Sequence, residues 1–269
     1  MKNDMLKIKL AILLFCCAAV LFGAGCDDFN PFEVDGTKYR AEETFSFSVN
    51  PDNQERLAIR AINGSVEIIG VPGASTVEIS GLRIVNAESI RDAEKYLGRL
   101  NVNIRMSGDE VAVETEQPSS TNGREFIVEY HVRVPASWDI VLNHTNGEVK
   151  VDSIAGAVDI DHTNGNIRLS EITGDVFVDL TNGQVNARVG AAASGVCKMS
   201  LVNGQILLSI PKTTDAAFSA AVTNGRVSVK DLALTNMTSR QNAVNGTLGN
   251  GQGEINLRLV NGNIDVSGY

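Results

Sequence analysis

Two histidines, His144 and His162, are the side chains whose chemistry depends most on how the chain folds. They stand 18 residues apart, and each is followed by Thr-Asn-Gly. If the chain winds so that such positions stack at about 4.8 Å, the two imidazole rings can share a metal ion or lie on one another. The next equivalent residue is Leu180, so at most two imidazoles meet. We therefore treat His144 and His162 as weak candidates for metal ligands and favour a structural stack.

The other reactive side chains give little support for catalysis. Cys197 falls on an inward, apolar position of its segment, which predicts a core residue rather than a nucleophile. The sequence has no G-x-S-x-G, H-E-x-x-H, P-loop or dinucleotide-binding motif. Its acidic residues alternate with neutral polar ones, which is typical of a solvated strand face. We expect no catalytic residue and no cofactor, and a carbohydrate-active β-helix enzyme is the alternative.

Composition narrows the class of partner. The chain has 23 basic and 32 acidic residues, and its net charge of −9 argues against a nucleic-acid partner, because phosphate binding needs a basic face. Aromatic residues make up 5% of the chain, and the single tryptophan, Trp138, stands where the repeats begin. Exposed aromatic rings commonly form the apolar platform of a sugar site. We therefore expect a protein partner rather than a glycan.

The first 25 residues are predicted to be a signal peptide. Three lysines precede an apolar run at residues 10–22, and small residues then lead to Cys26. The run is shorter than the roughly 20 residues that span a bilayer. The segment resembles the bacterial lipoprotein signal, and this resemblance implies that Cys26 is acylated and anchors the mature chain to a membrane. Plain cleavage and an uncleaved anchor are the alternatives.

A repeated Asn-Gly pair is the strongest pattern in the sequence. From Asn146 onward, apart from an additional pair at Asn250, the pairs follow at intervals of 18, 18, 21, 21, 21 and 16 residues. Apolar residues occupy alternate places after each glycine, as in Val149/Val151 and Val158/Ile160. This alternation predicts short strands with one buried face, and Asn-Gly supplies the positive φ that a sharp turn requires.

Two all-β architectures fit these units. We favour a single-stranded β-solenoid, or β-helix-like repeat array, of 18–21 residues per coil with one short helical insertion. The alternative is an antiparallel β-meander in which each Asn-Gly closes a hairpin. Only a solenoid explains why the turn residue recurs, because stacked coils place the asparagines in a hydrogen-bonded ladder. The predicted ladder contains Asn146, Asn164, Asn182, Asn203, Asn224, Asn245 and Asn261.

The segments before the repeats are less regular. Residues 26–44 are polar and predicted to be a tether, and residues 45–135 form an N-terminal β region with a helix near 87–98. Residues 136–269 form the Asn-Gly β-repeat solenoid. Because Asn63-Gly-Ser-Val-Glu-Ile already has the repeat pattern, we expect one continuous β architecture. A separate N-terminal domain is the alternative.

The repeats, the early Asn63-Gly-Ser-Val-Glu-Ile and the Val-Pro-Ala-Ser-Trp-Asp-Ile segment together resemble the bacterial adhesin β-repeat family, also called toast-rack domains. The resemblance covers residues 45–269. It implies a β-solenoid-like fold in envelope proteins, some of them linked to envelope-stress signalling. It implies no catalytic residues.

These observations together predict a non-enzymatic, membrane-anchored envelope lipoprotein. It would act as an adhesin-like binding or scaffold module, held to the membrane through lipid at Cys26 and contacting a protein partner in the envelope. We expect it at the periplasmic face of a membrane or at the cell surface. A structural or envelope-stress-sensing module is the remaining alternative.

Overall fold

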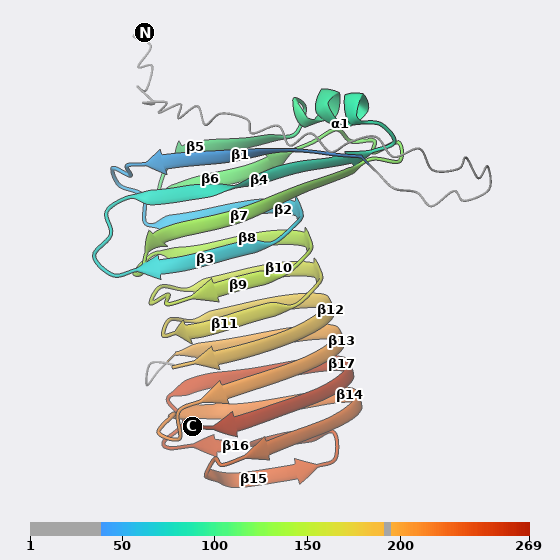
Figure 1. Cartoon of the computed structure of the whole chain (residues 1–269). Helices are drawn as coiled ribbons and strands as arrows, with labels where there is room; N and C mark the ends of the chain where they lie inside the picture. Colours follow the sequence, from blue (N-terminus) through green and yellow to red (C-terminus); the bar gives the residue numbers. More distant parts are fainter. Residues whose placement is uncertain (1–38, 191–194) are drawn as a thin grey trace, which may run out of the picture. The chain divides into compact units, whose positions relative to one another are not determined.

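The computed structural model describes residues 39–190 and 195–269, and the predictions for residues 1–38, including Cys26, lie outside them. The described residues form seventeen strands in one curled sheet and a single helix (Figure 1). The prediction of an all-β fold with one short helix is therefore confirmed. The elements are β1 (Tyr39–Val49), β2 (Arg56–Asn63), β3 (Val66–Val71), β4 (Val77–Ala87), α1 (Ile90–Leu97), β5 (Asn101–Ser107), β6 (Glu110–Glu116), β7 (Glu125–Pro135), β8 (Asp139–Asn146), β9 (Val149–Asp152), β10 (Val158–Asn164), β11 (Ile167–Ile172), β12 (Val176–Val189), β13 (Val196–Ile210), β14 (Ala216–Lys230), β15 (Leu234–Arg240), β16 (Ala243–Leu248) and β17 (Gly253–Gly268).

The repeats wind into rungs, each with strand segments before and after its Asn-Gly corner, and in β12, β13, β14 and β17 one strand runs through the corner. We call the strands before the corner the first face of the solenoid and those after it the second face. On the first face β10 pairs in parallel with both β8 and β12, so that Ile160 lies beside Leu142 and Val178. On the second face β11 likewise pairs in parallel with β9 and β12. Parallel neighbours confirm the solenoid for these rungs, because the meander required antiparallel ones.

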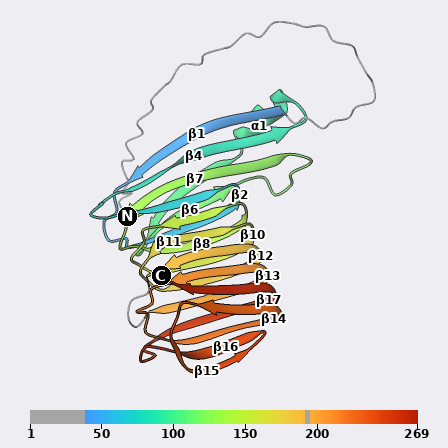
Figure 2. The ribbon, with the colours of Figure 1, turned by 60° about the horizontal axis from the view of Figure 1, so that its bottom comes forward.

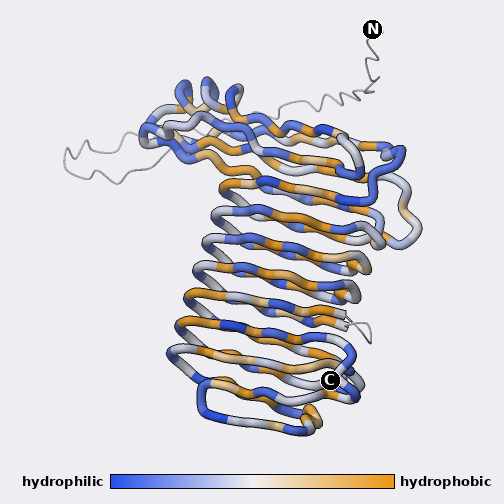
Figure 3. Tube along the Cα trace, turned by 180° about the vertical axis from the view of Figure 1, so that it is seen from behind, coloured by the Kyte–Doolittle hydropathy of each residue, from blue (hydrophilic) through white to orange (hydrophobic). Residues whose placement is uncertain are grey.

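The core lies between the two faces. Along each strand, aliphatic side chains at alternate positions point inward, and Ile140, Ile160 and Val176 are fully buried. Figure 3 shows the resulting alternation of apolar and polar segments along the rungs. Burying one such side chain contributes about 1.5–3 kcal/mol, and the rungs share a single continuous cluster of them. The two-residue period of the sequence thus determines which side of each strand is buried.

The order of the last rungs differs from the order of the sequence. β17, the final strand of the chain, lies between β13 and β14 and pairs in parallel with both (Figure 1). Beyond β14 the first face continues with β16 and then β15, which are antiparallel (Figure 2). The chain reverses its direction at Gln241 and Asn242, where Arg240 of β15 pairs with Ala243 of β16. The final rung is therefore held inside the stack.

The N-terminal end has a related arrangement. The rung formed by β2 and β3 lies between β6/β7 on one side and β8/β9 on the other. β2 and β3 thus join the N-terminal region and the repeats in one sheet. The outermost strands, β1 and β4 beside β7 and β5 beside β6, pair in antiparallel fashion. Each end of the solenoid therefore carries an antiparallel cap.

Two boundaries differ from the predicted ones. β1 begins at Tyr39, so residues 39–44 are strand rather than tether, because they pair with β4. The helix occupies Ile90–Leu97, inside the predicted range of 87–98, and Ser89 caps it by accepting a hydrogen bond from the Asp92 N–H. Among residues 39–190 and 195–269, no helix is long and apolar enough to span a bilayer.

Candidate functional site

An asparagine ladder runs along the Asn-Gly corner. The Asn164 amide donates to the Asn146 Oδ1 at 2.9 Å, and the Asn182 amide donates to the Asn164 Oδ1 at 2.9 Å. All the bonds have the same direction, which leaves each inner asparagine both donating and accepting. In spatial order the ladder contains Asn63, Asn146, Asn164, Asn182, Asn203, Asn261 and Asn224.

Asn245, which was predicted to join the ladder, does not belong to it. It lies in β16, which is antiparallel to β14, and its Oδ1 accepts a hydrogen bond from the Ser219 hydroxyl at 2.8 Å. The antiparallel register places Asn245 opposite Ser219, in the middle of the strand and not at the corner that contains Asn224. Asn63 is in the ladder instead, and its amide donates to the Phe126 carbonyl at 3.0 Å. The early repeat at Asn63 was the signal in the sequence for this.

The glycines after the ladder asparagines allow the rungs to approach closely. Gly165 has a φ of 142°, and a Cβ placed on it would lie 1.8 Å from the Gly147 carbonyl oxygen. No L side chain fits that space or readily adopts that backbone conformation. The corner is therefore a narrow ridge whose outward side chains are mostly polar.

His144 and His162 stack as the spacing predicts. Their ring centroids are 4.8 Å apart with planes 5° from parallel, and the exposed fractions of the two residues are 4% and 1%. The His162 Nδ1 lies 3.0 Å from the His144 carbonyl oxygen, and its Nε2 lies 3.0 Å from the Gly147 carbonyl oxygen. Both nitrogens of His162 thus contact main-chain acceptors, so neither is directed toward a shared metal position.

Burial has a strong effect on His144. Burial is the main reason that the pKa of His144 falls from 6.5 to about 4, and the neighbouring His162 contributes in the same direction. The Gly64 main chain opposes this shift, although neither ring nitrogen of His144 has a partner at ideal hydrogen-bond geometry among the described residues. The pair is therefore a polar element in a mostly apolar core, between two rungs of the body of the solenoid, by which we mean the rungs from β8 to β13.

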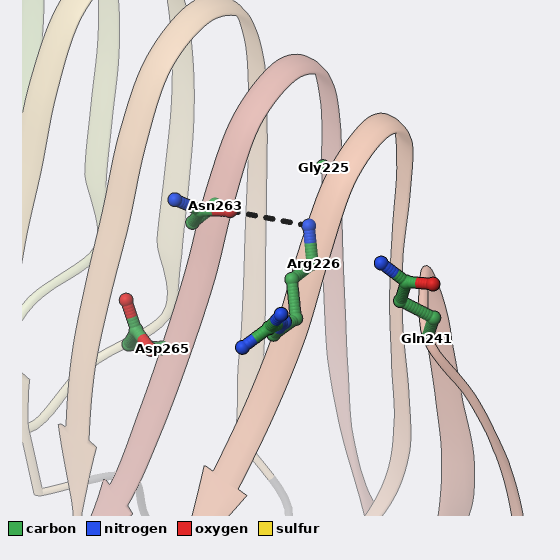
Figure 4. A pocket seen from close by; sticks show the side chains of 5 residues that line it. All are labelled: Gly225, Arg226, Gln241, Asn263 and Asp265. Carbon is green, nitrogen blue, oxygen red and sulfur yellow. Dashed lines mark hydrogen bonds between the residues drawn. The ribbon is translucent and has the colours of Figure 1, made fainter.

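A polar cleft of about 500 Å³ lies at the corner of the last rungs. It is lined by Gly225, Arg226, Gln241, Asn263 and Asp265 (Figure 4). The Arg226 N–H donates to the Asn263 Oδ1 at 3.2 Å. Sequence reasoning missed this cleft, because only the insertion of β17 beside β14 brings residues 263–265 next to residue 226.

The family model Toastrack DUF4097 matches residues 51–267. The chain belongs to the toast-rack family. No curated protein matches the sequence significantly.

Solved structures similar to this toast-rack chain include a candidate cell adhesion protein from Clostridium sporogenes, with 13% identity and a TM-score of 0.47 over 85% of this chain and 100% of that one. A candidate adhesin from Bacteroides fragilis has 10% identity and a TM-score of 0.31 over 84% and 97% of the two chains. A candidate adhesin from Parabacteroides merdae has 10% identity and a TM-score of 0.21 over 84% and 96%.

The remaining reactive groups of this toast-rack chain do not form a catalytic arrangement. Burial raises the pKa of the Cys197 thiol to about 12, so this core residue is a poor nucleophile. Asp159, Asp161 and Asp179 are neighbours on the exposed first face, where burial and then the other two carboxylates raise the pKa of Asp159. No group of three metal-ligating side chains occurs in the described part of the chain.

Proposed function

We propose that this toast-rack chain is a non-enzymatic, lipid-anchored binding or scaffold module of the bacterial cell envelope. The observation that carries the proposal is the asparagine ladder, which holds seven rungs in register and gives the solenoid a rigid, mostly polar corner. Rigid surfaces of stacked repeats are typically used to bind partners. The resemblance to the toast-rack family implies an envelope protein, and the family match over residues 51–267 supports that resemblance.

A role in binding fits the side chains better than a role in catalysis. The one described thiol is buried, both histidines of the stack face the core, and the aspartates of the first face lie on an open sheet. A glycosidase would need two carboxyl groups facing each other across a cleft. The cleft near Arg226 contains a single carboxylate, that of Asp265, which accepts a hydrogen bond from the Gln205 amide.

The lipid anchor is the first part of the proposal to test. Cells expressing the full chain are fed an alkyne-tagged palmitate, and the labelled protein is detected in the membrane fraction. We expect Cys26→Ser to lose the label and leave the membrane, because it removes the proposed acylated sulfur. Cys17→Ser, in the preceding apolar run, is the matched control and should keep both properties. Label that persists in Cys26→Ser contradicts the proposed anchor.

The binding role is tested by site-specific photocrosslinking in native membranes. The crosslinking residue replaces Val202 or Val260, which precede two ladder asparagines and are 42% and 41% exposed. The buried Leu201 is the control position. We expect a discrete protein adduct from the exposed positions and none from the control. Absence of any adduct, or hydrolysis of a polysaccharide by the purified chain, would contradict the proposed role.

A further inference from the structure

Four strand edges lack a neighbour on one side within the described residues. They are β1, β5, β15 and the second half of β14. In β14 only residues 216–221 are covered by β16, whereas residues 226–230 pair with β17 alone. We call residues 226–230 the open edge. At this end the first face thus extends two strands farther than the second face (Figure 2).

The main chain of the open edge presents hydrogen-bonding groups away from β17. The Val227 N–H donates to the Gln241 carbonyl at 3.0 Å, so Val227 directs its main chain away from β17. Alternate residues of a strand direct these groups to the same side. The N–H and C=O of Val229 therefore also point outward, beyond the reach of the turn at Gln241. A guest strand could therefore form hydrogen bonds with both the N–H and the C=O of Val229.

The side chains beside the open edge are only partly covered. Val227 points inward, and Val229, two residues on, is partly buried against the core. The β15–β16 hairpin buries Val244 and Leu248, while the second face has no strand opposite this hairpin among the described residues. Leu232 and Leu234 at this end are also only partly buried. A guest strand with aliphatic residues at alternate positions would complete this layer of the core.

The outward side chains of the open edge are basic. Arg226 and Lys230 lie on either side of Ser228 and form no ion pair with any described residue. Acidic side chains directly across from them would be favourable. By contrast, a second copy paired antiparallel about Ser228 would place Arg226 opposite Lys230, which is unfavourable. The charges thus favour an acidic guest over self-association.

The other three edges have features that oppose strand addition. β15 carries an irregularity between Thr235 and Thr238, where Asn236 has a φ of 50°, and its exposed side chains other than Met237 are polar. β1 carries Arg40 and Glu42 as an ion pair, and Arg105 of β5 is paired with Glu114. Bulges and charges are common protection for exposed edges. The open edge has no bulge and only one sign of charge.

We propose that the open edge binds an extended segment of a protein partner in which aliphatic residues alternate with acidic ones. The guest forms main-chain hydrogen bonds with Val229, packs its aliphatic side chains near Val229 and Leu232, and directs its carboxylates toward Arg226 and Lys230. This inference rests on the proposed binding role and specifies one site and one class of partner for it.

The probe is a labelled synthetic peptide in which valine alternates with glutamate, and the matched peptide has lysine in place of glutamate. Binding to the mature chain is measured by fluorescence anisotropy. We expect the acidic peptide to bind at least about ten-fold more tightly than the basic one. The double variant Arg226→Glu with Lys230→Glu should reverse this preference, since both side chains point outward and folding should not depend on them. Equal binding of the two peptides by the wild type would overturn the proposal.

Val229→Pro tests the main-chain contact. It removes an N–H that points outward and spares the bonds to β17. We expect it to weaken binding of the acidic peptide at least about ten-fold, while Met237→Pro, in the irregular part of β15, leaves binding unchanged. Circular dichroism confirms that both variants are folded. Unchanged binding by Val229→Pro, or a dimer of the mature chain that this variant abolishes in sedimentation, would overturn the proposal.

The inference about the open edge can be contradicted without contradicting the proposed binding role. If the acidic peptide does not bind but the crosslinked adducts at Val202 and Val260 persist, only the inference about the open edge is wrong. If those adducts are also absent, the binding role itself is contradicted.

Discussion

The Asn-Gly pair has different structural roles in the body of the solenoid, from β8 to β13, and in its C-terminal end, from β14 to β17. From β8 to β13 each pair forms a corner, and successive rungs follow one another along the chain. At the C-terminal end, Asn245-Gly246 lies within the antiparallel strand β16, and β17 lies between two earlier strands. The same dipeptide thus forms a corner only where the neighbouring rung runs parallel. The difference indicates that the ladder is a property of the stack rather than of the local sequence.

We expect the largest difference between the two regions in how much a Gly→Ala substitution lowers the free energy of unfolding. In Gly165→Ala the new Cβ would lie 1.8 Å from the Gly147 carbonyl oxygen, at a φ of 142°. We expect a loss of about 3–5 kcal/mol in the free energy of unfolding, from strain and overpacking together. Gly246→Ala is the matched control, because its nearest contact, the Thr235 carbonyl oxygen, would be 3.1 Å away. Urea unfolding measures both variants, and equal losses would contradict this comparison.

The fold of the body is well predicted from the sequence, because residues close to one another in the sequence determine it. Alternating residues such as Val158 and Ile160 determine which side is buried, and the shared spacing of His144 and His162 predicts their stack. The main-chain carbonyls that contact His162 are not predictable, because they depend on the relative position of two rungs.

The C-terminal end could not be predicted because its pairing is decided by contacts distant in sequence. The segment around Asn245 has the same local pattern as a rung, yet it reverses its direction. The insertion of β17, and with it the cleft between Arg226 and Asp265, depends on which strands meet last. Local periodicity carries no information about that choice.

The second difference between the regions concerns pH. The body contains a buried residue, His144, that makes the stability of the chain depend on pH. The pKa of His144 is about 4 in the folded chain and 6.5 in its ordinary environment, mainly because of burial. The unfolded chain therefore binds a proton more readily, so the contribution of His144 to stability is intact above about pH 6.5 and is lost as the pH falls toward 4. The full loss is up to about 3 kcal/mol.

His144→Leu tests this pH dependence, because Leu180 is the natural residue at the equivalent place two rungs away. We expect the variant to show a smaller loss of stability between pH 6.5 and 4 than the wild type. The exposed His131, which contacts Glu67, provides the control variant His131→Gln, which should keep the wild-type dependence. Thermal unfolding at several pH values measures the three proteins. Identical slopes for His144→Leu and the wild type would show that this histidine does not cause the dependence.

The smallest expected difference concerns the asparagine side chains themselves. Asn182 donates to the Asn164 Oδ1 and accepts from the Asn203 amide, so Asn182→Ala removes two hydrogen bonds and leaves both neighbours without their partner. These groups are exposed to water, which limits the cost to about 1 kcal/mol. Asn182→Asp should cost at least as much at neutral pH, because a carboxylate cannot donate and would face the Asn164 oxygen.

Asn245→Ala is the counterpart of Asn182→Ala outside the ladder. It removes the single hydrogen bond from the Ser219 hydroxyl, and we expect a cost of at most about 0.5 kcal/mol. Urea unfolding of the three asparagine variants compares these effects under one set of conditions. If Asn245→Ala costs as much as Asn182→Ala, cooperation along the ladder contributes nothing beyond ordinary surface hydrogen bonds. The regular recurrence of asparagine at the corners would then have to be explained by the turn alone, since Asn and Gly also favour that backbone conformation.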